Sequence, residues 1–124
     1  MIFQRGEIWL VQFSDLPEGG EQGFKRPAVV VSSDGINDLP LDVVTVIPCT
    51  SRRRENNKTR KVPANLVEVS PSSINGLTEV SYFMCEQVRS VSKSVRMKRK
   101  LGAMDADDMK RLEQALCLVL HLFP

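Results

Sequence analysis

The sequence predicts a single, mainly β domain: a small antiparallel barrel of about five to seven strands followed by one C-terminal α-helix. Short segments rich in β-branched and aromatic residues recur along most of the chain, which is typical of strands. Turn-forming residues separate these segments at intervals of about ten residues. With 124 residues, 42% hydrophobic and 26% charged, the chain fits one domain, 1–124, that folds around its own core.

The first half of the chain contains three predicted strands. Residues 7–13 and 28–33 are rich in Val, Ile and aromatic side chains. Residues 43–49 form a near-continuous apolar run, which predicts a strand buried on both faces. Between the last two, residues 34–40 carry turn chemistry throughout.

The second half is less regular. Further strand-like segments are 62–69, 77–83, 86–91 and 98–104. Pro63 predicts that the first of them lies at a sheet edge or starts late, because proline cannot donate to a ladder. We expect a bend near Cys85, a helical turn over 92–97, and either a short last strand or a linker over 98–104.

The C-terminal helix begins with a capping signal. Asp105 is a good N-cap, and Asp108 at the third helical position completes a capping box. One apolar face then follows at spacings of three and four residues, comprising Met109, Leu112, Leu116, Val119 and Phe123. From Ala115 onward almost every side of the helix is apolar, so we expect a partner subunit to cover its end and the chain to form a homodimer.

Cysteine usage and hydropathy predict a cytoplasmic protein. Cys49, Cys85 and Cys117 are odd in number and far apart, as expected for reduced thiols, and Cys49 is expected to be a buried structural thiol. The N-terminal residues carry no secretory signal, and the longest apolar stretch, residues 116–120, is too short to span a membrane.

The positive charge of the chain is concentrated in two segments. The formal net charge is only +2, but most of the 17 lysines and arginines fall in residues 52–61 and 89–100, where Glu55 is the single acid. Such clustering raises the local potential and attracts polyanions. Nucleic acid is therefore the leading class of partner.

A third cationic feature is the segment 20–27, which leads directly into the second strand. Pro27 disfavours a helical conformation for Arg26, so Arg26 should be extended at the strand entry. Its guanidinium stays charged and offers a planar set of donors that matches phosphate. The segment therefore predicts an anion site.

Other polar residues border predicted strands. Thr50 and Ser51 follow the third strand and could donate to a phosphate oxygen, although such hydroxyls more often satisfy turn backbone. Glu86 lies within a β pattern, where a partly buried carboxylate could move protons.

A metal site is not expected. The only histidine, His121, lies in the apolar end of the helix and is expected to be a core or interface residue. One histidine and scattered cysteines give no zinc spacing. Asp34, Asp38 and Asp42 are interpreted as turn formers. Any phosphodiester cleavage should therefore proceed without a metal.

Together these segments resemble the MazF/PemK-type toxins of bacterial toxin–antitoxin pairs. The matching motifs, in the order of the family, are 5–11, 20–27, 28–33, 46–51 and 85–91. The resemblance implies a Src-homology-3-like barrel, a homodimer, and sequence-selective cleavage of single-stranded RNA by 2′-hydroxyl attack, leaving 2′,3′-cyclic phosphate and 5′-hydroxyl ends. It implies no cofactor, and inhibition by a cognate antitoxin whose disordered segment covers the RNA groove.

The resemblance also assigns roles to residues. Arg26 and Thr50 match the catalytic arginine and threonine, while Glu21 and Glu86 are alternative proton acceptors. Expected RNA-binding residues are Gln22, Lys25, Ser51, Arg52, Arg53, Arg54, Lys58, Gln87 and Arg89. Gly20 and Met84 depart from side chains that other members have at these positions, and the basic segment 52–61 looks individual to this chain.

Two other functions are compatible with the same fold. One is a non-enzymatic toxin that poisons DNA gyrase through its C-terminal residues, and the other is a nucleic-acid-binding barrel without catalysis. Retention of the Arg-Pro and Cys-Thr-Ser elements favours the nuclease over the gyrase poison.

Overall fold

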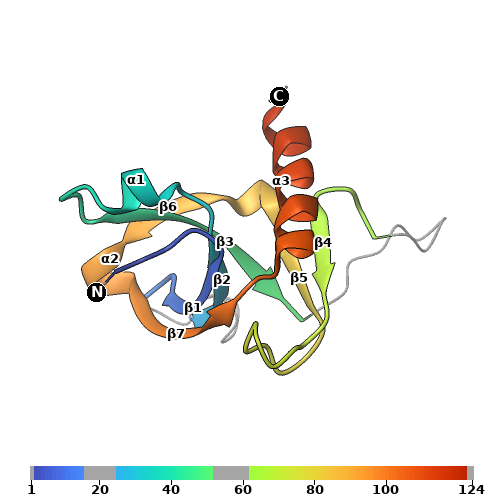
Figure 1. The fold of residues 1–124 in the computed structure, drawn as a ribbon, viewed down its shortest axis with the longest axis horizontal. Coiled ribbons are helices and arrows are strands. Elements are labelled where there is room, and N and C mark those ends of the chain that lie inside the picture. Colours follow the sequence, from blue (N-terminus) through green and yellow to red (C-terminus); the bar gives the residue numbers. More distant parts are fainter. Residues whose placement is uncertain (1, 16–24, 52–61, 123–124) are drawn as a thin grey trace.

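The computed structural model describes residues 2–15, 25–51 and 62–122. Its strands are β1 (Glu7–Gln12), β2 (Lys25–Val30), β3 (Val43–Thr50), β4 (Leu66–Val69), β5 (Ser81–Met84), β6 (Arg89–Ser92) and β7 (Met97–Ala103) (Figure 1). Its helices are α1 (Asp34–Asn37), the 3-10 turn η2 (Cys85–Gln87), α2 (Lys93–Arg96) and α3 (Ala106–Leu120).

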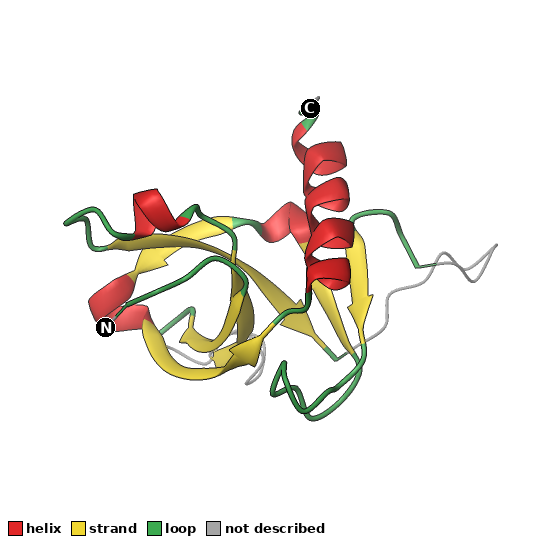
Figure 2. Cartoon of the chain, in the orientation of Figure 1, coloured by secondary structure: helices red, strands yellow, loops and turns green. Residues whose placement is uncertain are grey.

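All strands pair antiparallel in one curled seven-stranded sheet, and α3 stands against one side of it (Figure 2). The order is β4-β5-β3-β2-β1-β7, and β6 pairs with β3 off this path. The predicted class, a mainly β fold with a C-terminal helix, is confirmed. The barrel is not closed, however, because β4 and β7 are the two ends of the path.

Strand β3 is the centre of the sheet because it is long enough to pair with two strands, one after the other, along one edge. Its first half pairs with β6 and its end pairs with β5, while β2 lies along its other edge. Burial on both faces was predicted from its apolar run. Val46 belongs to one hydrophobic cluster with Trp9, and Ile47 belongs to another with Phe83. Alternate side chains thus supply both cores.

Several boundaries of helices and strands differ from the predicted ones, and local interactions explain the differences. The 34–40 turn contains the one-turn helix α1, which Ser33 caps by accepting a hydrogen bond from the Ile36 N–H. Strand β4 starts only at Leu66, whose N–H donates to the Pro63 carbonyl in a turn. Residues 77–80, predicted as strand, belong to a loop, and the expected bend near Cys85 is η2.

Helix α3 begins as predicted, but only half of the capping box forms. The Asp105 carboxylate accepts a 2.8 Å hydrogen bond from the Asp108 N–H, whereas the Asp108 side chain pairs with Arg111. On the predicted apolar face Leu112 is buried in the core. At the other end His121 is exposed in a left-handed conformation and ends the helix, so it is a C-cap and not a core residue.

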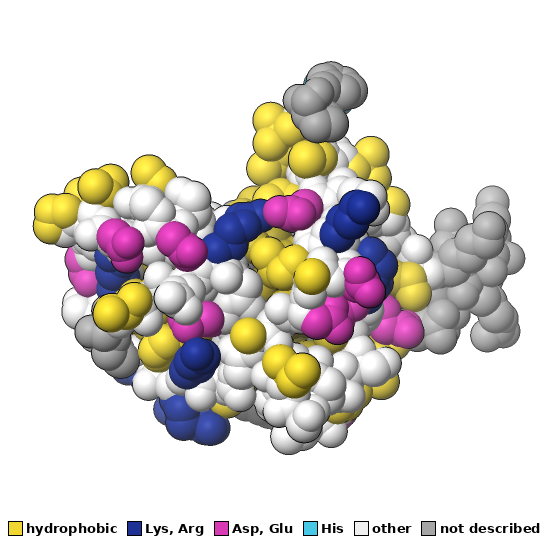
Figure 3. Space-filling view, in the orientation of Figure 1, with side chains coloured by type: hydrophobic (Ala, Val, Ile, Leu, Met, Phe, Trp, Pro, Cys, Tyr) yellow, Lys and Arg dark blue, Asp and Glu magenta, His cyan; other side chains and the backbone are white. Residues whose placement is uncertain are grey.

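Exposed hydrophobic side chains gather around the C-terminal end of α3 and over α1, besides others spread over the surface (Figure 3). At the end of α3, Leu118 is 63% exposed, and Leu120 and Leu122 are also exposed. This is the part of the helix that was expected to be covered by a partner subunit. Among the residues described, no helix has the length and apolar character needed to cross a membrane.

Candidate active site

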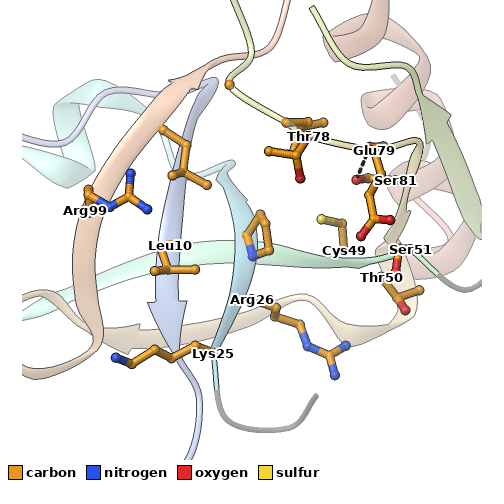
Figure 4. A pocket seen from close by; sticks show the side chains of 14 residues that line it. Leu10, Lys25, Arg26, Cys49, Thr50, Ser51, Thr78, Glu79, Ser81 and Arg99 are labelled. Carbon is orange, nitrogen blue, oxygen red and sulfur yellow. Dashed lines mark hydrogen bonds between the residues drawn. The ribbon is translucent and has the colours of Figure 1, made fainter. Parts of the chain in front are cut away.

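A pocket of about 390 Å³ lies where the start of β2, the end of β3 and the loop before β5 meet (Figure 4). Charged and hydroxyl side chains line it together with apolar ones from β1 and β7. The polar members are Lys25, Arg26, Thr50, Ser51, Thr78, Glu79, Ser81 and Arg99. Two catalytic residues predicted from the sequence, Arg26 and Thr50, are among them.

The strand register explains why Arg26 and Thr50 meet. In the β2–β3 ladder Ala28 pairs with Pro48, and each step toward the start of β2 is matched by a step toward the end of β3. Arg26 and Thr50 each lie two residues beyond this last pair, Arg26 in register with Val11 of β1 and Thr50 in register with Tyr82 of β5, and both line the pocket. Thr50 is only 8% exposed and Arg26 is half-buried, so both side chains are held by the sheet.

The floor of the pocket is a thiol that stays protonated. Burial is the main cause that raises the pKa of Cys49 to about 12; the charge of Glu79 also raises it, while a hydrogen bond with Ser81 and the charge of Arg26 lower it. Cys49 is 2% exposed, which agrees with the predicted buried structural thiol. It is therefore not a nucleophile at neutral pH.

Other expected site residues are divided between the pocket and its surroundings. Lys25 and Ser51 line the pocket. Glu86 does not: it is exposed in η2, and its carboxylate accepts a 2.8 Å hydrogen bond from Asn65 Nδ2. Gln87, also in η2, lies outside the pocket, and the Arg89 guanidinium sits 5.2 Å from the centre of the Phe13 ring. Glu86 thus does not line the pocket that holds Arg26 and Thr50.

The remaining expected residues lie outside the described part of the chain. They are Glu21, Gln22, Arg52, Arg53, Arg54 and Lys58.

Two charged lining residues were missed by the sequence analysis. Arg99 comes from β7 and belongs to the basic segment 89–100. The sequence therefore indicated that it could attract a polyanion, but not that it lines the pocket. Glu79 comes from the loop before β5 and carries the pocket's carboxylate among the described residues. No local pattern marks Glu79, because a chain reversal that depends on distant residues brings it to the pocket.

Two of the three aspartates that were interpreted as turn formers hold neighbouring segments by hydrogen bonds. Asp34 accepts a 2.7 Å hydrogen bond from the Arg5 N–H, and Asp42 accepts hydrogen bonds from Ser92 and Ser94. Within residues 2–15, 25–51 and 62–122, no group of three or more His, Cys, Asp or Glu side chains could hold a metal ion.

Comparison with known proteins agrees with the fold and places the chain in a family. Residues 4–120 match the family described as PemK-like, MazF-like toxin of type II toxin–antitoxin system. The chain is 33% identical to Endoribonuclease MazF9 of Mycobacterium tuberculosis, over 98% of this chain and 99% of that protein. The chain therefore belongs to the PemK/MazF toxin family.

Solved structures share the fold at lower sequence identity. A crystal structure of MazF from Deinococcus radiodurans superposes with a TM-score of 0.75 at 23% identity, covering 98% of this chain and 99% of that one. A mycobacterial endoribonuclease in complex with its cognate antitoxin superposes with a TM-score of 0.72 at 23% identity, over 98% of this chain and 99% of that one.

Proposed function

We propose that this chain is the toxin of a toxin–antitoxin pair and acts as a sequence-selective, metal-independent endoribonuclease on single-stranded RNA. Cleavage by 2′-hydroxyl attack would leave 2′,3′-cyclic phosphate and 5′-hydroxyl ends. The observation that carries the proposal is that Arg26 and Thr50 line one pocket, together with Lys25 and Arg99. The relative named an endoribonuclease, at 33% identity over nearly the whole chain, supports the same activity.

In the proposed reaction, Arg26 and Thr50 hold the phosphate that is attacked. The 2′-hydroxyl gives its proton to a carboxylate and forms a bond to phosphorus, while the bond from phosphorus to the 5′-oxygen breaks and that oxygen takes up a proton. Arg26 stabilises the charge that develops on the phosphorane oxygens, and Thr50 donates a hydrogen bond to a non-bridging oxygen. Glu21, near Arg26 in the sequence, is the carboxylate proposed to accept the proton.

The mechanism accounts for RNA as the substrate, because DNA lacks the attacking hydroxyl. Single strands are expected because duplex RNA hides the base edges that a selective enzyme must read. Lys25 and Arg99 at the pocket, together with Arg52, Arg53, Arg54 and Lys58, are proposed to contact backbone phosphates. Binding should then weaken steeply as salt is raised.

The proposed partners follow from the family and from the exposed apolar surface. The cognate antitoxin is proposed to cover the RNA groove with a disordered segment; a mycobacterial structural neighbour is described in complex with its antitoxin. The exposed leucines at the end of α3 support a homodimer in which a second copy covers them. We place the pair in the cytoplasm.

The test is cleavage of a long single-stranded RNA in EDTA, with the cut ends mapped. The wild type should cut at a recurring short sequence, and Arg26→Ala should lose activity by about 10²–10³-fold or more. Lys110→Ala, an exposed cation on α3 away from the pocket, is the control that removes the same charge. A folded Arg26→Ala protein that cuts at the wild-type rate would refute the assignment. Intact RNA with the wild type would contradict the nuclease, and a gyrase assay would follow.

A further inference from the structure

The loop between β4 and β5 is fixed by a buried asparagine. Asn75 is 3% exposed, and its side-chain oxygen accepts 3.0 Å hydrogen bonds from the Ser72 and Leu77 N–H groups. Its amide donates to the Ser70 carbonyl at 2.9 Å. One side chain thus satisfies backbone groups on both arms of the loop, so the loop holds a defined shape without a regular element.

Two glycines bring this loop into contact with β7. Gly76 has a φ of +71°, and a Cβ added there would overlap the backbone carbonyl of Leu101. A Cβ at Gly102 would overlap the Ile74 carbonyl, and the Ala103 N–H donates to that same carbonyl at 3.0 Å. Backbone therefore packs directly on backbone, and the loop cannot shift along β7 without a clash.

Glu79 lies at the end of this rigid loop and faces the catalytic pair. The buried hydroxyl of Ser81 donates to the Glu79 carbonyl at 3.0 Å, which fixes the backbone (Figure 4). In Figure 4 the carboxylate extends into the pocket beside Cys49 and toward Thr50. Within the described residues no hydrogen bond or ion pair joins this carboxylate to another side chain.

A carboxylate so close to a phosphate site favours particular groups of the ligand. It repels the phosphate backbone that Arg26 attracts, and it favours a group that presents hydrogen-bond donors, such as the N–H groups of a base. Among the four bases, guanine offers two adjacent donors on its Watson–Crick edge, N1–H and the N2 amino group, which fit the two oxygens of one carboxylate. Uracil offers one N–H between two carbonyl acceptors, which the carboxylate repels.

We propose that Glu79 is a specificity-determining residue that selects guanine in the nucleotide next to the cleaved phosphate. This inference rests on the proposed ribonuclease function and names the base that the site reads. The rigid loop supports it, since a reading group must be held in place before the RNA arrives. The exposure of Glu79 also suits hydrogen bonding to a base more than proton transfer, which buried carboxylates perform best.

The experiment compares wild type with Glu79→Gln on a pool of single-stranded RNA with randomised positions around the cut. The wild type should require guanine at one position next to the cut, and Glu79→Gln should relax this preference by about 10- to 100-fold, the usual discrimination of a bidentate contact. A substrate with inosine at that position, which lacks the N2 amino group, should slow the wild type but not the variant. Glu68→Gln, an exposed glutamate on β4 outside the pocket, is the matched control.

Each alternative result has a distinct meaning. An unchanged preference in Glu79→Gln overturns the inference and leaves the nuclease intact. An equal loss of rate on every sequence, with an altered pH–rate profile, also overturns it and assigns Glu79 to proton transfer. A wild type that cuts no RNA contradicts the proposed function and this inference with it.

Discussion

The two walls of the pocket are built in different ways. The wall that carries Arg26 and Thr50 is sheet, in which Arg26 pairs with Val11 of β1 and Thr50 pairs with Tyr82 of β5. The wall that carries Glu79 is a loop, which is held by the Asn75 side chain and by the contact of Gly76 with β7. A ladder tolerates most side chains at its positions, whereas the loop depends on a few particular residues. Arg26 and Thr50, which are proposed to act in cleavage, thus lie on the strand ladder. Glu79, which is proposed to select the base, lies on the loop that depends on particular residues.

The largest effect should come from removing the hydroxyl on the ladder wall. Thr50→Val keeps the shape and burial of the side chain but removes the donor, so we expect cleavage to fall by about 10²–10³-fold. The free energy of unfolding should stay close to wild type, because the ladder is unchanged. Single-turnover cleavage and chemical denaturation measure the two quantities. The exposed neighbour Ser51→Ala should lose much less activity, and equal losses would contradict the role given to Thr50.

A change in the loop wall should reduce stability and selectivity together. In Gly76→Ala the new methyl group meets the Leu101 carbonyl and the backbone has a positive φ, so the free energy of unfolding should fall by about 2–4 kcal/mol. Urea denaturation tests this, and cleavage of the randomised RNA pool tests the selectivity. Gly35→Ala is the matched control, since a Cβ there meets nothing within 4 Å. Equal stability of the two variants would show that the loop can move away from β7.

The smallest effect is expected for a variant in the β1–β7 strand pair, which supports the loop wall, and it concerns the free energy of unfolding. Glu7 on β1 is 7% exposed, accepts hydrogen bonds from the Gln4 and Trp9 N–H groups, and forms a 3.0 Å ion pair with Lys100 on β7. Burial by itself raises the pKa of Glu7, but these partners outweigh it and hold the pKa below the ordinary value of 4.5. Glu7→Gln should therefore lower the free energy of unfolding by about 1 kcal/mol at pH 7.

The lowered pKa of Glu7 determines how the stability difference between wild type and Glu7→Gln changes with pH. A carboxylate whose pKa is lowered in the folded state stabilises the fold above its unfolded pKa, and the contribution is lost as pH falls through the folded pKa. The difference between wild type and Glu7→Gln should therefore be constant from pH 7 to pH 5 and shrink below about pH 4.5. Denaturation series at pH 7, 5 and 3 measure it, and a difference that grows toward low pH would be inconsistent with this linkage.

The strands of the ladder wall could be predicted from the sequence because their signals are local, while the joint role of Arg26 and Thr50 followed from the resemblance to the toxin family. Pro27 fixes the backbone next to Arg26, and the apolar run before Thr50 identifies a buried strand. Two adjacent antiparallel strands then bring their ends together whatever the length of the segment between them. The strand boundaries shifted by a few residues, but the meeting of Arg26 with Thr50 does not depend on them.

The loop wall could not be predicted because its shape depends on contacts between distant residues. Residues 77–80 have the composition of a strand, yet Asn75 and the contact of Gly76 with Leu101 hold them in a loop. Glu86 illustrates the opposite case. Its place within a motif predicted a candidate proton acceptor, whereas in the structure it does not line the pocket and its side chain accepts a hydrogen bond from Asn65. A pattern in the sequence locates residues along the chain, and only packing decides which side of a turn they occupy.

The thiol beside Thr50 has a consequence for oxidative chemistry. Peroxides and alkylating reagents attack the thiolate, and the raised pKa of Cys49 keeps this side chain in the protonated thiol form at physiological pH. Burial also keeps such reagents away from the sulfur. We therefore expect Cys49 to resist oxidation and alkylation, so that redox control of the proposed catalytic residue Thr50 through this thiol is not expected.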